Sequence, residues 1–253
     1  MAEFRDLKQV IRCNFPFKFH DMTRIITSVF LFVLLAAGAL QGAGQKQDLS
    51  RTFPVGQFSS IEVEGNFKVF LYQSEAPYVK VLAPSDDMYE ALDIRTTSGE
   101  LRISVHRRTF NLSRVELHIG FRELRELRVA GGLKLVTEGF LELGDFRIIL
   151  EGGGNVDMKV KSASMEVIST GGAVFDLSGV TGRLSVKVAG AGHVNARELT
   201  AREVTFRVEG VGFGSVHATH LLDVKIEGVG KVTYQGTPEV KRIIEGLGKV
   251  EQY

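Results

Sequence analysis

Apolar and polar residues alternate one by one along much of the chain. The alternation is strict in Leu101–Val105 and Val115–Ile119, and it recurs in Ser60–Glu64, Lys68–Tyr72 and Tyr78–Leu82. A period of two places successive side chains on opposite faces of a β-strand. These segments are therefore predicted to be strands with one buried face.

One stretch departs from this pattern. Residues Ser85–Leu92 have the composition of a short helix that begins with a capping residue. No long stretch after Phe53 has the 3.6-residue periodicity of an amphipathic helix. The sequence therefore predicts an all-β fold with one short helix.

Short segments that combine glycines with a valine recur through the second half of the chain. They are GGGNV ending at Val156, TGGAV at Val174, GAGHV at Val194, GFGSV at Val216, GVGKV at Val232 and GLGKV at Val250, so that the valines are 18, 20, 22, 16 and 18 residues apart. A unit of about 20 residues is too short for a pair of helices, and the leucine-rich repeat pattern is missing. Each unit is predicted to form one turn of a coil of stacked β-structure.

The paired glycines are predicted to form the same corner in every turn. Glycine permits positive φ angles and close approach of stacked backbones. We expect this of both members of a pair, including the second glycines Gly192, Gly230 and Gly248. The segment Phe175-Asp176 breaks the alternation that follows the other corners.

The first part of the chain has the features of an export signal. Ile25–Leu40 contains 16 uncharged residues, follows Arg24 and ends in small residues. This length is short of the roughly 20 residues that a membrane-spanning helix needs. Residues 1–44 are therefore predicted to be an N-terminal extension and signal peptide, with the signal proper at 22–44 if translation starts at Met22. If the segment is not cleaved, the protein is a membrane-tethered sensor ectodomain that contacts the membrane only through this segment.

Export is predicted to deliver the protein to the periplasm, the outer membrane or the cell surface. The only cysteine, Cys13, precedes the apolar segment, so the exported part has no disulfide and no cysteine-based zinc site. The chain has 31 Lys and Arg against 30 Asp and Glu. This balance gives no electrostatic reason to expect nucleic acid as a partner.

Several segments together resemble a known family. They are Phe58–Val63, Lys68–Leu71, the serial glycine corners, Val232–Pro238 and Ile244–Val250. From Arg51 to the C-terminus the chain resembles the putative auto-transporter adhesin, head GIN domain family, which is common in Bacteroidota. The resemblance implies a single-stranded, right-handed, parallel β-helix-like solenoid over residues 51–253, with turns of about 20 residues and an envelope location. It brings no catalytic residues with it. Phe67 and Thr170 stand where glycine is expected, so the first turns are expected to be irregular.

The glycine-rich segments do not match motifs that bind nucleotides or calcium. Gly228–Val232 lacks the spacing of a phosphate loop, and Gly210–Gly214 is not a dinucleotide-binding fingerprint. Gly152–Asp157 is similar to a calcium-binding nonapeptide, but that motif needs stacked aspartates at a nine-residue period. Asp157 is expected to have no counterpart on the neighbouring turns. No G-x-S-x-G segment occurs, which argues against an α/β-hydrolase.

The densest histidines are His193, His217 and His220. In a strand, residues three apart point to opposite faces, so His217 and His220 do not converge on one ion. A histidine zinc site also needs a third ligand. These histidines are interpreted as solvated residues of turns and strands.

Acidic residues are the other candidates for chemistry. Enzymes that cleave glycosidic bonds use a pair of carboxylates on one face. Asp157, Asp176 and Glu198 are candidates, but their places within the repeat differ. We therefore predict no catalytic, cofactor-binding or metal-binding residues.

The sequence favours a non-enzymatic module of the cell envelope or surface. Such an adhesin-like or structural module would use an extended β-face to bind an envelope macromolecule, either protein or glycan. The alternatives are a carbohydrate-active enzyme on a β-helix scaffold and the tethered sensor. The absence of tryptophan counts against the enzyme, since sugar-binding platforms often use aromatic rings.

Overall fold

The computed structural model describes residues 49–106 and 114–253. The predicted signal at Ile25–Leu40 lies outside these residues. The described part is almost entirely β-structure, as the alternation predicted, and its helix α2 (Asp86–Glu90) falls within the predicted helical stretch. No helix in these residues is long and apolar enough to cross a membrane.

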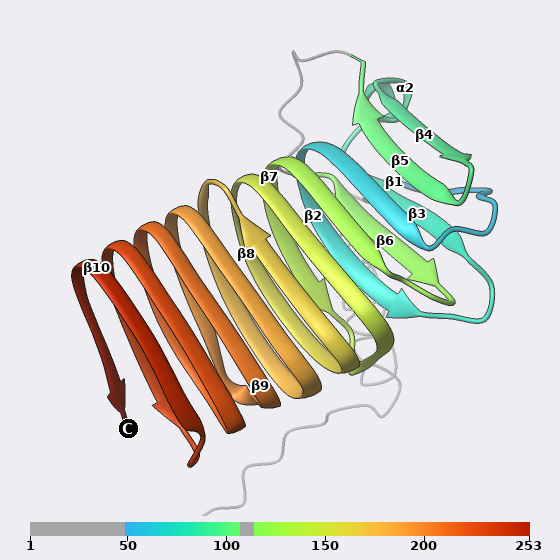
Figure 1. The fold of residues 1–253 in the computed structure, drawn as a ribbon. Coiled ribbons are helices and arrows are strands. Elements are labelled where there is room, and N and C mark those ends of the chain that lie inside the picture. The colour runs from blue at the N-terminus through green and yellow to red at the C-terminus, as the bar shows by residue number, and fades with distance from the viewer. Residues whose placement is uncertain (1–48, 107–113) are drawn as a thin grey trace, which may run out of the picture. The chain divides into compact units, whose positions relative to one another are not determined.

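The strands of the described part form one ten-stranded sheet that winds into a coil (Figure 1). They are β1 (Leu49–Phe53), β2 (Ser60–Gln73), β3 (Tyr78–Ala83), β4 (Leu92–Thr97), β5 (Glu100–Val105), β6 (Glu116–Phe121), β7 (Glu126–Thr137), β8 (Leu141–Ser169), β9 (Gly172–Gln235) and β10 (Glu239–Gln252). All five segments predicted from alternation correspond to strands. Ser60–Glu64 and Lys68–Tyr72 both belong to β2, and the other three correspond to β3, β5 and β6. The longest strands bend at corners, so that β9 passes along the coil several times (Figure 1).

Parallel pairing links β2, β7, β8, β9 and β10 in order. Glu126 of β7 lies beside Arg147 of β8, Gly153 of β8 beside Gly172 of β9, and Leu221 of β9 beside Glu239 of β10. Adjacent passes are therefore close to the predicted 20 residues apart. We call each pass a rung.

The sheet is mixed, which corrects the prediction of a parallel arrangement throughout residues 51–253. Strand β3 pairs antiparallel with β1 and β6, and β4 pairs antiparallel with β5. These strands lie at the N-terminal end of the coil, where they continue the ladder beyond β2 (Figure 1). The alternation predicted β3, β5 and β6 but not β1 and β4, and it carried no information about strand direction.

Each rung has two arms that meet at a glycine corner, and alternate side chains of both arms join one hydrophobic core. Leu127 pairs with Ile148, and Val167 pairs with Val186, and all four side chains are fully buried. Complete burial of such a side chain contributes about 1.5–3 kcal/mol. The core therefore depends on correct stacking of the rungs.

The first glycine of each corner stacks on the corner glycine of the preceding rung. The column contains Gly65, Gly131, Gly152, Gly171, Gly190, Gly210, Gly228 and Gly246. All except Gly171 have positive φ angles. The second glycines Gly192, Gly230 and Gly248 do not, so the expectation of positive φ there was wrong. A Cβ atom would lie 2.9 Å from the Val188 side chain at Gly192, 2.8 Å from the Gly212 carbonyl oxygen at Gly230, and 3.1 Å from the Ile226 and Ile244 side chains at Gly248.

The observed register also corrects the alignment of two segments. Gly171, not Thr170, occupies the corner column, so Thr170 is no exception to the glycine pattern. Gly228 stacks on Gly210, and the Thr233 hydroxyl donates to the Gly214 carbonyl at 3.2 Å. Val232 therefore lies beside Gly214 rather than in a column with Val216.

Candidate functional site

The outward-facing positions just after the corner glycines form a distinctive surface, which we call the corner face. It comprises the first and third residues after each corner glycine. Toward the C-terminal end the face combines Lys231 and Lys249 with large, exposed apolar residues. The apolar residues include Val211 (44%), Phe213 (46%), Val229 (44%) and Leu247 (77%).

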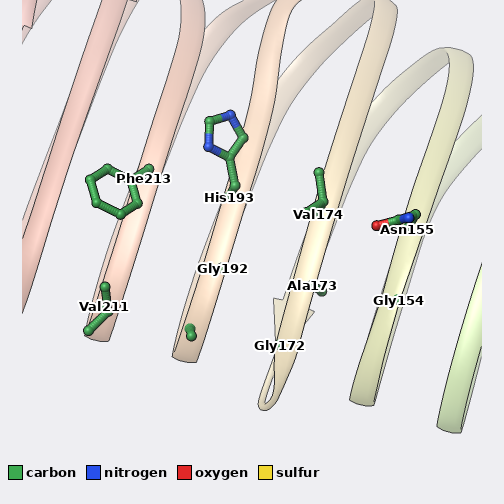
Figure 2. A pocket seen from close by; sticks show the side chains of 10 residues that line it. Gly154, Asn155, Gly172, Ala173, Val174, Gly192, His193, Val211 and Phe213 are labelled. Carbon is green, nitrogen blue, oxygen red and sulfur yellow. The ribbon is translucent and has the colours of Figure 1, made fainter.

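A hollow of about 390 Å³ interrupts the corner face on the middle rungs. Gly172 and Ala191 lie on its floor, where the side chains are absent or a single methyl group. Figure 2 shows Asn155, Val174, His193 and Phe213 projecting from successive passes along one side. Val211 and Phe213 close its C-terminal end. The remaining lining residues are Gly154, Ala173 and Gly192.

A second hollow of about 270 Å³ occupies the equivalent positions of the first two rungs. Its lining includes Asn66 and Lys68 of β2 and Gly132 and Lys134 of β7. Lys134 pairs in register with Asn155, which lines the first hollow. The two hollows therefore follow one another along the coil, and we call them together the corner groove.

The lysines at the two ends of the corner face differ in their partners. Lys68 Nζ contacts Glu116 Oε1 at 2.7 Å. Lys231 and Lys249 both contact Glu251, and their hydrogen bonds lower the pKa of this carboxyl to about 2. Lys134 forms no ion pair within the described residues. Among the lysines of the corner face, Lys134 is therefore the one whose ammonium group can bind an anionic ligand.

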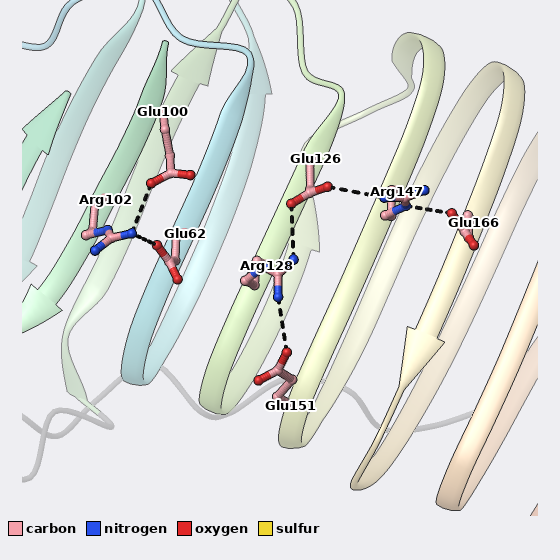
Figure 3. A network of polar contacts seen from close by, with 8 residues as sticks. All are labelled: Glu62, Glu100, Arg102, Glu126, Arg128, Arg147, Glu151 and Glu166. Atoms are coloured by element: carbon pink, nitrogen blue, oxygen red, sulfur yellow. Dashed lines mark hydrogen bonds and ion pairs between the residues drawn. The ribbon is translucent and has the colours of Figure 1, made fainter. Parts of the chain in front are cut away.

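The arm that precedes the glycine corner carries a different surface. Figure 3 shows Arg128 between Glu126 and Glu151, and Arg147 between Glu126 and Glu166. The equivalent positions further along the coil continue this pattern, with Arg207 bound to Asp223 through contacts of 3.1 and 2.6 Å. These charges neutralise one another across rungs. This surface is therefore a solvated face rather than a binding site for a charged ligand.

The structure brings two of the three candidate acids together. Asp157 of β8 pairs in register with Asp176 of β9, and Asn195 donates to Asp176 Oδ1 at 3.0 Å. The expectation that Asp157 has no counterpart was therefore wrong. Glu198 is not part of this column and is exposed. The two aspartates lie exposed on the arm rather than in a lined cavity, and no cluster of three His, Cys, Asp or Glu suited to a metal occurs in residues 49–106 and 114–253.

The three candidate histidines remain apart. His193 lines the corner groove, whereas His217 Nδ1 lies 3.4 Å from the Thr200 hydroxyl. His220 is exposed near the opposite bend of the rung.

Sequence reasoning missed a polar and aromatic cluster where β6 joins β2. The Tyr72 hydroxyl and His118 Nδ1 are hydrogen-bonded at 2.8 Å, and the rings of Phe70 and His118 stack at 4.6 Å. Burial, followed by the charge of Glu138, raises the pKa of Tyr72. The alternation predicted both segments as strands, but only the register of β2 with β6 brings these residues together.

Comparison with known proteins identifies the family of the chain. The family model for the putative auto-transporter adhesin, head GIN domain matches residues 57–238, which is most of the chain. The chain belongs to this family. The resemblance noted in the sequence is thus confirmed. No curated protein matches the chain.

Solved structures share the fold of this head GIN domain protein. A putative adhesin from Bacteroides fragilis NCTC 9343 is 20% identical, with a TM-score of 0.76. A putative lipid binding protein from Parabacteroides distasonis ATCC 8503 is 21% identical with a TM-score of 0.65, and a putative adhesin from Parabacteroides merdae ATCC 43184 is 18% identical with a TM-score of 0.59. In each case the alignment covers 83% of this chain and 98% of the other chain.

Proposed function

We propose that this protein is an exported, non-enzymatic module of the cell envelope or surface that binds an envelope macromolecule, protein or glycan. The observation that carries the proposal is the row of exposed apolar side chains Val211, Phe213, Val229 and Leu247 on the corner face. Contiguous apolar patches on a soluble surface usually mark an interaction site. Family membership and the adhesin names of similar structures support the same function.

The proposal includes a right-handed sense for the coil, which the family resemblance implies. A β-coil gains its binding surface from repetition, because each rung adds the same positions beside those of the last. Here Leu247 pairs with Val229, so that the apolar row is continuous from β9 into β10. An extended partner could contact several rungs at once.

The test measures retention of the purified protein on isolated envelope fractions by sedimentation. We expect the double variant Val229→Glu/Leu247→Glu to lose at least about tenfold in affinity, because charges on the row would have to be buried at the interface. Ile243→Glu is the matched control, since Ile243 is also exposed on the last rung but belongs to the arm before the corner. Equal retention of the double variant and the control would contradict the proposal.

A carbohydrate-active enzyme is the second candidate, and the pairing of Asp157 with Asp176 is the observation that favours it. Two carboxylates on one face are the minimum for glycoside hydrolysis. Incubation of wild type and Asp157→Asn/Asp176→Asn with envelope polysaccharides distinguishes the candidates. Release of reducing ends by the wild type alone would establish the enzyme.

A further inference from the structure

The first residue after the corner glycine is small on four successive rungs. These residues are Gly132, Gly153, Gly172 and Ala191, of which Gly172 and Ala191 line the larger hollow, while the Asn66 side chain lies against Gly132. Asn66 precedes them on the first rung, and Val211 follows them. Neighbouring strands lie about 4.8 Å apart, so the distance from the rung of Lys134 to that of Phe213 is about 19 Å.

The groove floor offers little hydrogen-bonding capacity to a ligand. Gly132 pairs with Gly153, Gly153 pairs with Gly172, and the Ala191 N–H donates to the Gly171 carbonyl at 3.0 Å. The Gly132 N–H donates to the Asn66 side-chain oxygen at 2.7 Å, and the other backbone groups of the floor are used within the ladder. A peptide or glycan in the larger hollow would find hydrogen-bonding side chains only at Asn155 and His193, and its other polar groups would lose hydrogen bonds to water, which is costly. A hydrocarbon chain has no such bonds to lose.

The two ends of the corner groove differ in chemistry. Val174 stands beside its middle, and Val211 and Phe213 close the C-terminal end with apolar side chains. Lys134 stands near the other end and is exposed. The ion pair of Lys68 with Glu116 leaves Lys134 as the positive charge available there. The groove thus matches a ligand with one apolar tail and one anionic head.

We propose that the corner groove binds a long-chain fatty acid, with its carboxylate at Lys134 and its terminal methyl group against Val211 and Phe213. With carbon–carbon bonds of about 1.5 Å in a tetrahedral zigzag, an extended chain of 16 carbons spans about 19 Å. This length equals the distance of about 19 Å between the rung of Lys134 and that of Phe213. The site adjoins the row of apolar side chains to which the envelope macromolecule is assigned and shares Val211 and Phe213 with it, but the rest of the groove lies on the rungs that precede Val211.

Equilibrium dialysis of the purified full-length protein against radiolabelled palmitate, below the concentration at which palmitate aggregates, tests the proposal. We expect saturable binding of one palmitate per chain. Gly172→Leu should weaken it at least about tenfold, because a Cβ atom on Gly172 meets nothing within 4 Å and the longer side chain would fill the groove. Gly144→Leu is the matched control, since a Cβ atom there also meets nothing within 4 Å and Gly144 lies outside the groove.

The head group is tested separately. Lys134→Gln should weaken palmitate binding about tenfold and leave hexadecanol binding unchanged, whereas Lys159→Gln, which alters an exposed lysine away from the groove, should change neither. If Gly172→Leu does not fold, Ala191→Leu replaces it, because Ala191 is exposed and already carries a Cβ atom. The absence of saturable palmitate binding, or equal binding by the groove variant and Gly144→Leu, would overturn the proposal. Loss of palmitate binding in Gly172→Leu with normal retention on envelope fractions would separate this site from the macromolecule-binding row.

Discussion

The carbonyl oxygen of Gly171 lies 2.7 Å from the position that a Cβ atom would take on Gly190. Gly190 also has a φ angle of 134°, which L-residues with a side chain rarely adopt. Backbone contact and backbone conformation therefore demand glycine independently at this corner. The same two demands recur at Gly210 and Gly228.

The first prediction is that Gly190→Ala destabilises the protein. Strained backbone costs on the order of 1–3 kcal/mol, and displacement of the stacked rung adds to this cost. For a protein of this size the melting temperature should fall by about 2–4 °C for each kcal/mol. Gly172→Ala is the control, because nothing lies within 4 Å of its Cβ position. Equal melting temperatures for the two variants would show that the corner column does not require glycine.

The sequence predicted that glycines form corners but assigned the positive φ angle to both members of a pair. At Gly192 the φ angle is not positive, and a Cβ atom would lie 2.9 Å from Val188 Cγ1. That contact involves a side chain rather than backbone. Backbone conformation depends on stacking against the previous rung, which residue spacing alone does not reveal.

The register between rungs was the hardest feature to predict. Alignment of the repeats on their valines does not reproduce the observed register. The residue that recurs on every rung is the first corner glycine, and on one rung Gly214 stands where other rungs have a valine. This error concealed the pairing of Asp157 with Asp176. It also concealed the groove, because its floor is recognisable only when Gly172 and Ala191 are known to stack. A column of small residues is a property of the register rather than of any single segment.

The second prediction concerns the aspartate pair. Like charges opposite one another on neighbouring strands are destabilising, and cross-strand pairs contribute roughly 0.2–1 kcal/mol. Asp157→Asn should therefore raise the stability at pH 7 by several tenths of a kcal/mol. Asp145→Asn is the comparison, because Asp145 instead accepts a hydrogen bond from the Ser164 hydroxyl at 2.5 Å and should lose stability. Urea unfolding of the three proteins measures both effects, and a lower stability of Asp157→Asn would contradict the proposed repulsion.

The third prediction is that the triple variant of His193, His217 and His220 to alanine keeps the stability and metal content of the wild type. These side chains are separated in the structure, and a zinc site needs converging ligands. Elemental analysis and thermal unfolding provide the readouts. A stoichiometric metal in the wild type that disappears in the triple variant would contradict this expectation.

The fourth prediction is that the exported protein begins between residues 40 and 46 and is recovered outside the cytoplasm. Small residues follow the apolar core of the segment, which is where signal peptidase cleaves. N-terminal sequencing of protein from the envelope fraction measures the start. Intact protein that still carries Phe30–Leu35 and remains in the cytosol would rule out a cleaved signal.

The fifth prediction is that the ion pair between Arg207 and Asp223 makes the stability of the protein depend on pH. The hydrogen bonds from Arg207 hold the pKa of Asp223 below its ordinary value. A carboxyl whose pKa is lower in the folded than in the unfolded protein stabilises the fold above the unfolded pKa of about 3.9. That stabilisation disappears as the pH falls through the folded pKa, when the carboxyl is protonated in both states.

Wild type should therefore exceed Arg207→Gln in stability at pH 7, and the difference should shrink steadily below about pH 4. Both side chains are about one-third exposed, at 34% and 32%, so solvent screening limits the difference to about 1 kcal/mol. Arg183→Gln is the control, because Arg183 contacts Glu203 at a longer 3.6 Å and is 65% exposed. Chemical unfolding from pH 7 to pH 3 measures the three proteins together. A difference between wild type and Arg207→Gln that stayed constant across this range would show that Arg207 acts through packing of its side chain rather than through the Asp223 carboxylate.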